Sequence, residues 1–169
     1  MSDWFPKLKD IINCAYFMNL IVTGGAGFVG NHLVKYLVKK GHNVTVIDNL
    51  HKGKKENLED VFDKIEFFEI DIRDYDVLRI YLKNADGVFH EAALTAVPES
   101  FLMPQEYCDV NVRGTENILK LAKEIGFKLV YASSSSVYGD TTKIPIKEDF
   151  GRKPINPYGQ TKLECEFLA

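Results

Sequence analysis

The chain has 169 residues, of which 46% are hydrophobic and 27% charged, and its formal net charge is −3. This length suits one α/β domain, and an aromatic content of 12% is typical of a chain with a packed core and not of a disordered segment. Because 21 Lys and Arg face 24 Asp and Glu, nucleic-acid binding through bulk positive charge is disfavoured. Any bound phosphate must therefore be held locally.

Strand-like and helix-like segments alternate along the chain. Short apolar runs rich in β-branched residues predict strands at 19–23, 43–48, 64–70, 87–90 and 128–133. Segments with helical spacing predict helices at 28–40, 74–83, 105–124 and from Pro157 to the end of the chain. Residues 50–57 are predicted to form a polar, basic loop.

Apolar spacing within the helices predicts the faces that enter the core. These are Val29, Leu33, Tyr36 and Leu37 in the first helix, Val77, Ile80 and Tyr81 in the second, and Ile118, Leu121, Ala122 and Ile125 in the third. Gly41 and Gly126 follow helices at the positions where C-terminal caps are expected.

The alternation of strands and helices predicts a doubly wound parallel sheet, the Rossmann arrangement, with helices on both faces. In such a sheet the ligand site lies at the carboxyl ends of the strands. Residues 1–17 have no partner in this pattern and are predicted to be an N-terminal extension, with Met18 as an alternative start. The 3 cysteines lack metal-binding spacing, so neither zinc nor a disulfide framework is expected, and a cytoplasmic location is predicted.

A glycine-rich turn joins the first strand to the first helix. It matches G-x-G-x-x-G, the dinucleotide-binding fingerprint, in which glycines permit a tight turn and bring backbone amides and a helix N-terminus close to phosphates. Its predicted cofactor-binding residues are Gly24, Gly25, Ala26, Gly27, Phe28, Val29 and Gly30. A tight turn without a ligand is the structural alternative. A Walker A loop is excluded because Asn31 and His32 stand where Lys and Ser or Thr are required.

Asp48 ends the second predicted strand, 18 residues after Gly30, and Asn49 follows it. An acid at this position accepts hydrogen bonds from the adenosine ribose and repels a 2′-phosphate, so NAD is predicted over NADP.

Tyr158 and Lys162 lie four positions apart, on one face of the last predicted helix. A nearby ammonium stabilises a phenolate, which makes the tyrosine a workable general acid or base. The spacing alone is weak evidence, because Tyr36 and Lys40 share it and are expected to be a core tyrosine and a solvated lysine. The serine run 133–136 follows the fifth strand and can supply a hydroxyl, although a self-capping polar loop is the alternative for each serine.

From Met18 to Ala169 the chain resembles the extended short-chain dehydrogenase/reductases, and most closely the NAD-dependent nucleotide-sugar epimerases of the UDP-glucose 4-epimerase type. The matching segments are TGGAGFVG (23–30), VIDNL (46–50), DIRD (71–74), HEAALTAVPES (90–100), NVRGT (111–115), SSSSVYGD (133–140) and PYGQTK (157–162).

The resemblance implies a role for each matching residue. Asp71 and Ile72 would flank the adenine, Ala92, Ala93 and Thr95 would line the cofactor, Asn111 would support the site, and Ser134, Tyr158 and Lys162 would be catalytic, the last two also binding cofactor. It implies NAD as cofactor, a UDP-sugar as substrate, transient oxidation at sugar C4 and a homodimer for the full-length relative. It implies no metal, nucleic-acid or membrane partner.

Two departures from the family pattern shape the expectation. Ser135 and Ser136 stand where the 4,6-dehydratases of the family carry an Asp-Glu pair, which disfavours dehydration. Relatives are also about twice as long, so residues 18–169 are expected to form an incomplete NAD-binding domain without a substrate lobe, with impaired turnover. A non-catalytic NAD-binding module and UDP-uronate decarboxylation remain as alternatives.

Overall fold

The computed structural model describes residues 17–169. The predicted extension, 1–17, lies outside the described residues except for its last position. Within the described part, no helix is both long enough and apolar enough to cross a membrane.

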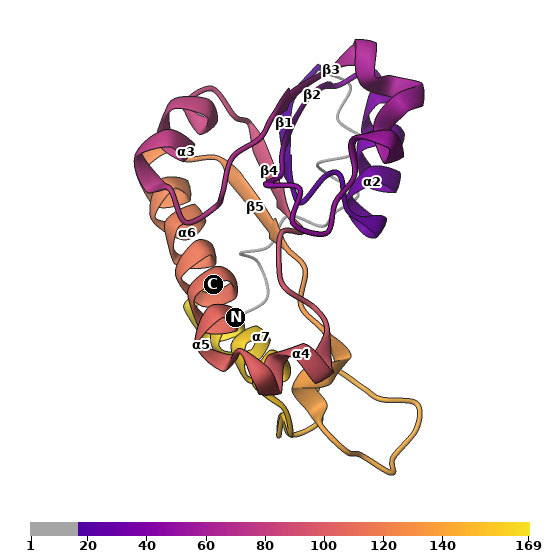
Figure 1. The fold of residues 1–169 in the computed structure, drawn as a ribbon, viewed down its shortest axis with the longest axis vertical. Coiled ribbons are helices and arrows are strands. Elements are labelled where there is room, and N and C mark those ends of the chain that lie inside the picture. The colour runs from indigo at the N-terminus through magenta and orange to yellow at the C-terminus, as the bar shows by residue number, and fades with distance from the viewer. Residues whose placement is uncertain (1–16) are drawn as a thin grey trace.

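One parallel sheet organises the domain (Figure 1). Its strands are β1 (Asn19–Thr23), β2 (Asn43–Ile47), β3 (Ile65–Phe68), β4 (Gly87–His90) and β5 (Lys128–Tyr131). Their spatial order is β3-β2-β1-β4-β5, so the chain first winds outward from β1 in one direction and then crosses to the other side. The predicted doubly wound sheet is confirmed, and its switch point lies between β1 and β4.

Helical segments cover both faces of the sheet. The α-helices are α2 (Phe28–Lys39), α3 (Tyr75–Leu82), α4 (Val97–Leu102), α5 (Pro104–Tyr107), α6 (Gly114–Ile125) and α7 (Pro157–Leu168). Tighter or wider turns form η1 (Lys55–Lys64) and η3 (Ser135–Tyr138), which are 3-10 helices, and η2 (Cys108–Arg113), which is a π-helix. The long helix predicted at 105–124 is therefore interrupted by η2, and α4, η1 and η3 occupy segments for which no helix is predicted.

Two hydrophobic cores form because side chains alternate across each strand. On β1, Leu20 and Val22 pack in the core that contains Val34 and Leu37 of α2. Ile21, between them, packs in the other core, against α3 and α6. Figure 1 shows α2 on one side of the sheet and α3 with α6 on the other.

The predicted core face of α2 is confirmed at Leu37, which is buried, and at Leu33, which packs against the core, and is wrong at Val29 and Tyr36. Val29 and Tyr36 are 59% and 43% exposed, whereas Gly30, Asn31, Val34 and Leu37 are buried. The cause is Gly30, which packs directly on the backbone of the glycine turn and so fixes the rotation of the helix about its axis. Tyr36 is accordingly a surface residue and not the core tyrosine expected for the Tyr36–Lys40 pair.

In α3 the predicted Tyr81 packs against the core but the predicted Ile80 does not, whereas the predicted face of α6 is confirmed. In α3, Leu78 and Leu82 are fully buried and Ile80 is 60% exposed, because residues four apart face α6 across the core. In α6, Ile118 and Leu121 are buried and Ala122 and Ile125 pack against them. Gly126 caps this helix in the left-handed conformation at φ 92°, as predicted.

Candidate functional site

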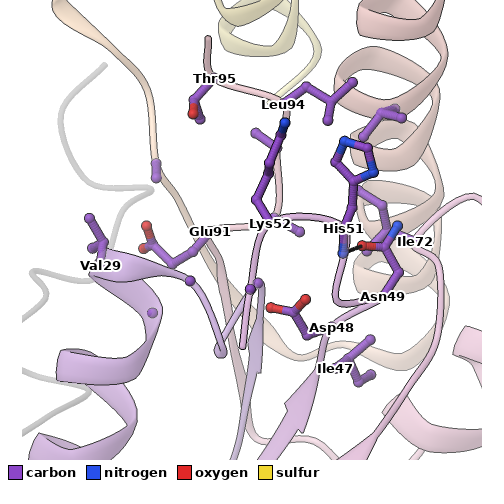
Figure 2. A pocket seen from close by; sticks show the side chains of 18 of the residues that line it. Val29, Ile47, Asp48, Asn49, His51, Lys52, Ile72, Glu91, Leu94 and Thr95 are labelled. Atoms are coloured by element: carbon purple, nitrogen blue, oxygen red, sulfur yellow. Dashed lines mark hydrogen bonds between the residues drawn. The ribbon is translucent and has the colours of Figure 1, made fainter. Parts of the chain in front are cut away.

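A pocket of about 560 Å³ opens at the carboxyl ends of the strands (Figure 2). The predicted site residues that line it are Gly24, Gly27, Phe28, Val29, Gly30, Asp48, Asn49, Ile72, Ala92, Ala93, Thr95, Tyr158 and Lys162. Residues far apart in the sequence therefore meet in one cavity, at the switch point where a doubly wound sheet binds its ligand. Gly25, Ala26, Asp71, Asn111 and Ser134 do not line the wall of this pocket.

The glycine turn folds so tightly that side chains would not fit in it. Gly24 has φ +70°, and a Cβ on it would lie 2.6 Å from the Ala92 backbone nitrogen. A Cβ on Gly30 would lie 2.2 Å from the Gly24 carbonyl oxygen. The following helix α2 has no side-chain cap and no acid in its first turn. Its first amides are therefore available to an anion in the pocket, with the helix dipole adding attraction.

Asp48 fastens this turn to the end of β2. Its carboxylate accepts hydrogen bonds from the backbone nitrogens of Ala26, at 3.0 Å, and Leu50, at 2.8 Å. Gly53 packs against the same carboxylate, since a Cβ there would lie 2.9 Å from both of its oxygens. Asp48 thus lines the pocket and also holds two loops that shape it. Ala26 does not line the pocket itself, but its backbone nitrogen fixes the Asp48 carboxylate.

Asp71 lies behind Asn49 and positions it. Its oxygens accept hydrogen bonds from the Arg73 Nε, at 2.9 Å, the Arg73 Nη2, at 2.8 Å, and the Asn49 side-chain nitrogen, at 3.0 Å. The Arg73 hydrogen bonds hold the pKa of Asp71 at about 2. Arg73, which the motif analysis leaves without a role, lines the pocket and also pairs with Glu106 at 2.9 Å.

Asn111 is buried beneath the pocket, in the π-helical turn η2. Its side chain donates to the Leu94 carbonyl and accepts from the Leu94 nitrogen, at 3.0 and 2.8 Å, and it also donates to the Thr161 hydroxyl at 3.0 Å. It therefore joins the loop after β4 to α7. π-Turns inside helices are frequent at functional sites.

His90, the last residue of β4, is neutral and buried. Burial lowers its pKa to about 3. Because the Thr115 hydroxyl already donates to the Asn111 carbonyl, we assign the His90 Nε2 as donor to Thr115, at 3.0 Å, and its Nδ1 as acceptor from Thr23, at 2.6 Å. The histidine thereby ties β1, β4 and α6 together.

Tyr158 and Lys162 lie in the first turns of α7 and are both nearly buried, at 8% and 4% exposure. The helix starts there because the Asn156 side chain caps the Gly159 nitrogen at 2.7 Å. The Lys162 Nζ donates to the Ala132 carbonyl at 2.8 Å and lies 4.7 Å from the centre of the Tyr131 ring. Burial lowers the pKa of Lys162 to about 8.

Two neighbouring serines of the run 133–136 have different positions and contacts. Ser134 caps η3, its hydroxyl oxygen accepting from the Ser136 nitrogen at 3.2 Å, which agrees with the alternative of a self-capping loop. Ser133 lines the pocket and hydrogen-bonds Glu166 of α7, which also pairs with Arg152 at 3.0 Å. Sequence reasoning could not separate these neighbours, because backbone direction within the run decides which hydroxyl reaches the cavity.

The burial of Lys162 predicts a specific pH dependence of stability. Its pKa falls from 10.5 to about 8 on folding, so between these values the unfolded chain binds more protons and stability rises with pH. Relative to Lys162→Met, the wild-type free energy of unfolding is expected to gain about 3 kcal/mol across this window. Denaturant unfolding at both ends of the window measures it. If the free energies of unfolding of the two proteins changed with pH in parallel, the pKa of Lys162 would not be lowered by folding.

The chain is similar in sequence to a known protein family. The model of the family described as the NAD dependent epimerase/dehydratase family matches residues 20–169. The UDP-glucose 4-epimerase of Lactobacillus helveticus is 40% identical over 152 residues, covering 88% of this chain and 45% of that protein. The chain thus spans about half the length of the curated relatives it matches.

Solved structures agree in fold. A UDP-glucose 4-epimerase from Stenotrophomonas maltophila, with bound NAD and formylated UDP-arabinopyranose, superimposes with a TM-score of 0.85 at 35% identity, over 89% of this chain and 47% of that one. A UDP-N-acetylglucosamine 4-epimerase from Methanobrevibacter ruminantium, in complex with UDP-N-acetylmuramic acid, gives 0.85 at 38% identity, over 90% and 49%.

Proposed function

Because the chain belongs to the NAD dependent epimerase/dehydratase family, we propose that it binds NAD in the pocket at the strand ends and acts as a nucleotide-sugar 4-epimerase. One observation carries the proposal. A single cavity joins the glycine turn and Asp48 to the buried Tyr158 and Lys162, which are the parts needed to hold a dinucleotide and to move a proton.

The residues present fit a dinucleotide. The space that a Cβ at Gly24 or Gly30 would occupy is filled by backbone, and the uncapped start of α2 suits a diphosphate. Asp48 and Asn49 would hold the adenosine ribose beside Ile72, and Ala92, Ala93 and Thr95 would line the path to Tyr158 and Lys162. NAD bound there would supply reversible hydride transfer at sugar C4.

The chain's own residues would handle the proton. Tyr158 would take it from the sugar 4-hydroxyl and later give it back. The Lys162 ammonium would stabilise the phenolate of Tyr158, and its hydrogen bond to Ala132 fixes its position. The family resemblance assigns the sugar oxygen to Ser134, whose hydroxyl keeps its proton free for donation because the cap on η3 uses only its oxygen, although Ser133 and not Ser134 lines the pocket wall.

The test is interconversion of UDP-glucose and UDP-galactose by purified protein supplied with NAD. Epimerisation supports the proposal, and failure to bind NAD overturns it. NAD binding without conversion favours a non-catalytic NAD-binding module. Loss of carbon dioxide from a UDP-uronic acid favours decarboxylation on the same scaffold.

Cofactor choice gives a separate prediction at Asp48. Wild type is expected to bind NAD about tenfold more tightly than NADP, because the carboxylate repels a 2′-phosphate. Asp48→Asn removes the charge, so it should narrow this preference. It keeps an acceptor for only one of the two amides, because Ala26 and Leu50 donate to different oxygens of the carboxylate. Titration calorimetry with both dinucleotides measures the ratio. Tighter binding of NADP by wild type would contradict the assignment of Asp48.

A further inference from the structure

Glu91 is a pocket residue that the motifs leave without a role. It directly follows β4, and its backbone nitrogen continues the parallel ladder by donating to the Thr23 carbonyl at 3.1 Å. The side chain lines the pocket, and Figure 2 shows its carboxylate directed toward Val29, on the other side of the view from Asn49 and Ile72. The end of β4 therefore presents a carboxylate to the cavity.

The other charged side chains that line the pocket are engaged by neighbours. Asp48 accepts two backbone amides, Arg73 pairs with both Asp71 and Glu106, and Lys52 pairs with Glu99 at 3.5 Å. Among residues 17–169, no hydrogen bond or ion pair reaches the carboxylate of Glu91. Its charge is consequently not neutralised by a fixed contact.

The strand ladder places Glu91 toward the Lys162 end of the pocket. The Ala132 nitrogen donates to the carbonyl of His90, the residue before Glu91, at 3.2 Å, and the Ala132 carbonyl accepts from the Lys162 Nζ at 2.8 Å. Burial raises the pKa of Glu91, and the positive charge of Lys162 opposes this rise. In turn, Glu91 counteracts the lowering of the Lys162 pKa. The two side chains therefore interact electrostatically.

We propose that Glu91 favours the oxidised over the reduced dinucleotide, through its charge at the Lys162 end of the pocket. This inference rests on the proposed NAD binding, with the nicotinamide toward Tyr158 and Lys162. The oxidised nicotinamide ring carries one positive charge and the reduced ring carries none. A nearby carboxylate without a fixed counterion therefore stabilises the oxidised form selectively, and in a partly enclosed site this attraction is larger than in water.

The test compares the dissociation constants of the oxidised and reduced dinucleotides for wild type and Glu91→Gln by titration calorimetry. Glu91→Gln keeps the shape of the side chain and removes its charge. The preference for the oxidised form is expected to fall about tenfold, mainly through weaker binding of that form. The matched control is Glu59→Gln, an equal charge change at an exposed position of η1, which should leave the ratio unchanged.

Each outcome bears on one claim. If wild type binds neither dinucleotide, the proposed function fails, and this inference fails with it. If wild type binds both and Glu91→Gln leaves their ratio unchanged, only the inference is overturned. An equal shift in Glu59→Gln would also overturn it, because net charge would then be the cause. If Glu91→Gln does not fold, Glu91→Ala must show the same fall, and a ratio equal to that of wild type overturns the inference.

Discussion

Gly30→Ala is expected to abolish dinucleotide binding and to lower the free energy of unfolding by about 3 kcal/mol. The new Cβ would lie 2.2 Å from the Gly24 carbonyl oxygen and 2.7 Å from the Gly25 Cα. These neighbours are backbone atoms of the turn, so relief requires α2 to move away from β1. That movement would separate the backbone amides at the start of α2 from the glycine turn, and these two parts are proposed to bind the diphosphate together.

Thermal unfolding and NAD titration of the purified variant measure both effects. Gly151→Ala is the matched control, because a Cβ at Gly151 meets no atom within 4 Å. It should leave both quantities near their wild-type values. Normal NAD affinity in Gly30→Ala would show that the close packing of α2 on the turn is not needed for binding.

Tyr158→Phe is expected to lower the rate of UDP-hexose interconversion about 1000-fold and to change NAD affinity less than about twofold. The phenol is proposed to carry the proton, and its removal leaves the ring in place. That ring packs edge-on against Tyr107, with centroids 6.5 Å apart, so the fold around α7 should persist. Rates are measured with NAD and UDP-galactose at equal protein concentrations.

The chain offers a second tyrosine with the same spacing to a lysine as a control. Tyr36 lies on the exposed face of α2, with the Lys40 Nζ 5.5 Å from its ring centre. Tyr36→Phe should keep the wild-type rate. Turnover that survives Tyr158→Phe would remove this tyrosine from the mechanism, whatever the NAD affinity.

The sequence by itself predicted the sheet and the location of its ligand site. Strands buried on both faces are apolar along their whole length, and glycines at fixed spacing have few other uses between a strand and a helix. These signals are local, because each depends on residues within one element or turn. The alternation of strands and helices also predicted that the strands run parallel, with right-handed crossovers, and the structure confirms the parallel pairing.

Helix rotation and the interruption of the long helix needed the tertiary structure. The rotation of α2 about its axis is decided by the contact between Gly30 and Gly24. The spacing of apolar side chains could not predict this, because a glycine has no side chain and is not counted as part of an apolar face. The π-turn η2 places Asn111 on Leu94 and Thr161, which are distant in sequence.

The division of labour within the site was likewise decided by contacts between distant residues. Ser133 rather than Ser134 lines the cavity, and Arg73 neutralises Asp71 while Glu91 keeps an unpaired carboxylate among residues 17–169. The sequence determined which chemical groups reach the strand ends, because strand direction and turn geometry are encoded locally. Only the tertiary structure decided which of these groups are paired, buried or open to the pocket, because charge and burial depend on neighbours that the fold brings together.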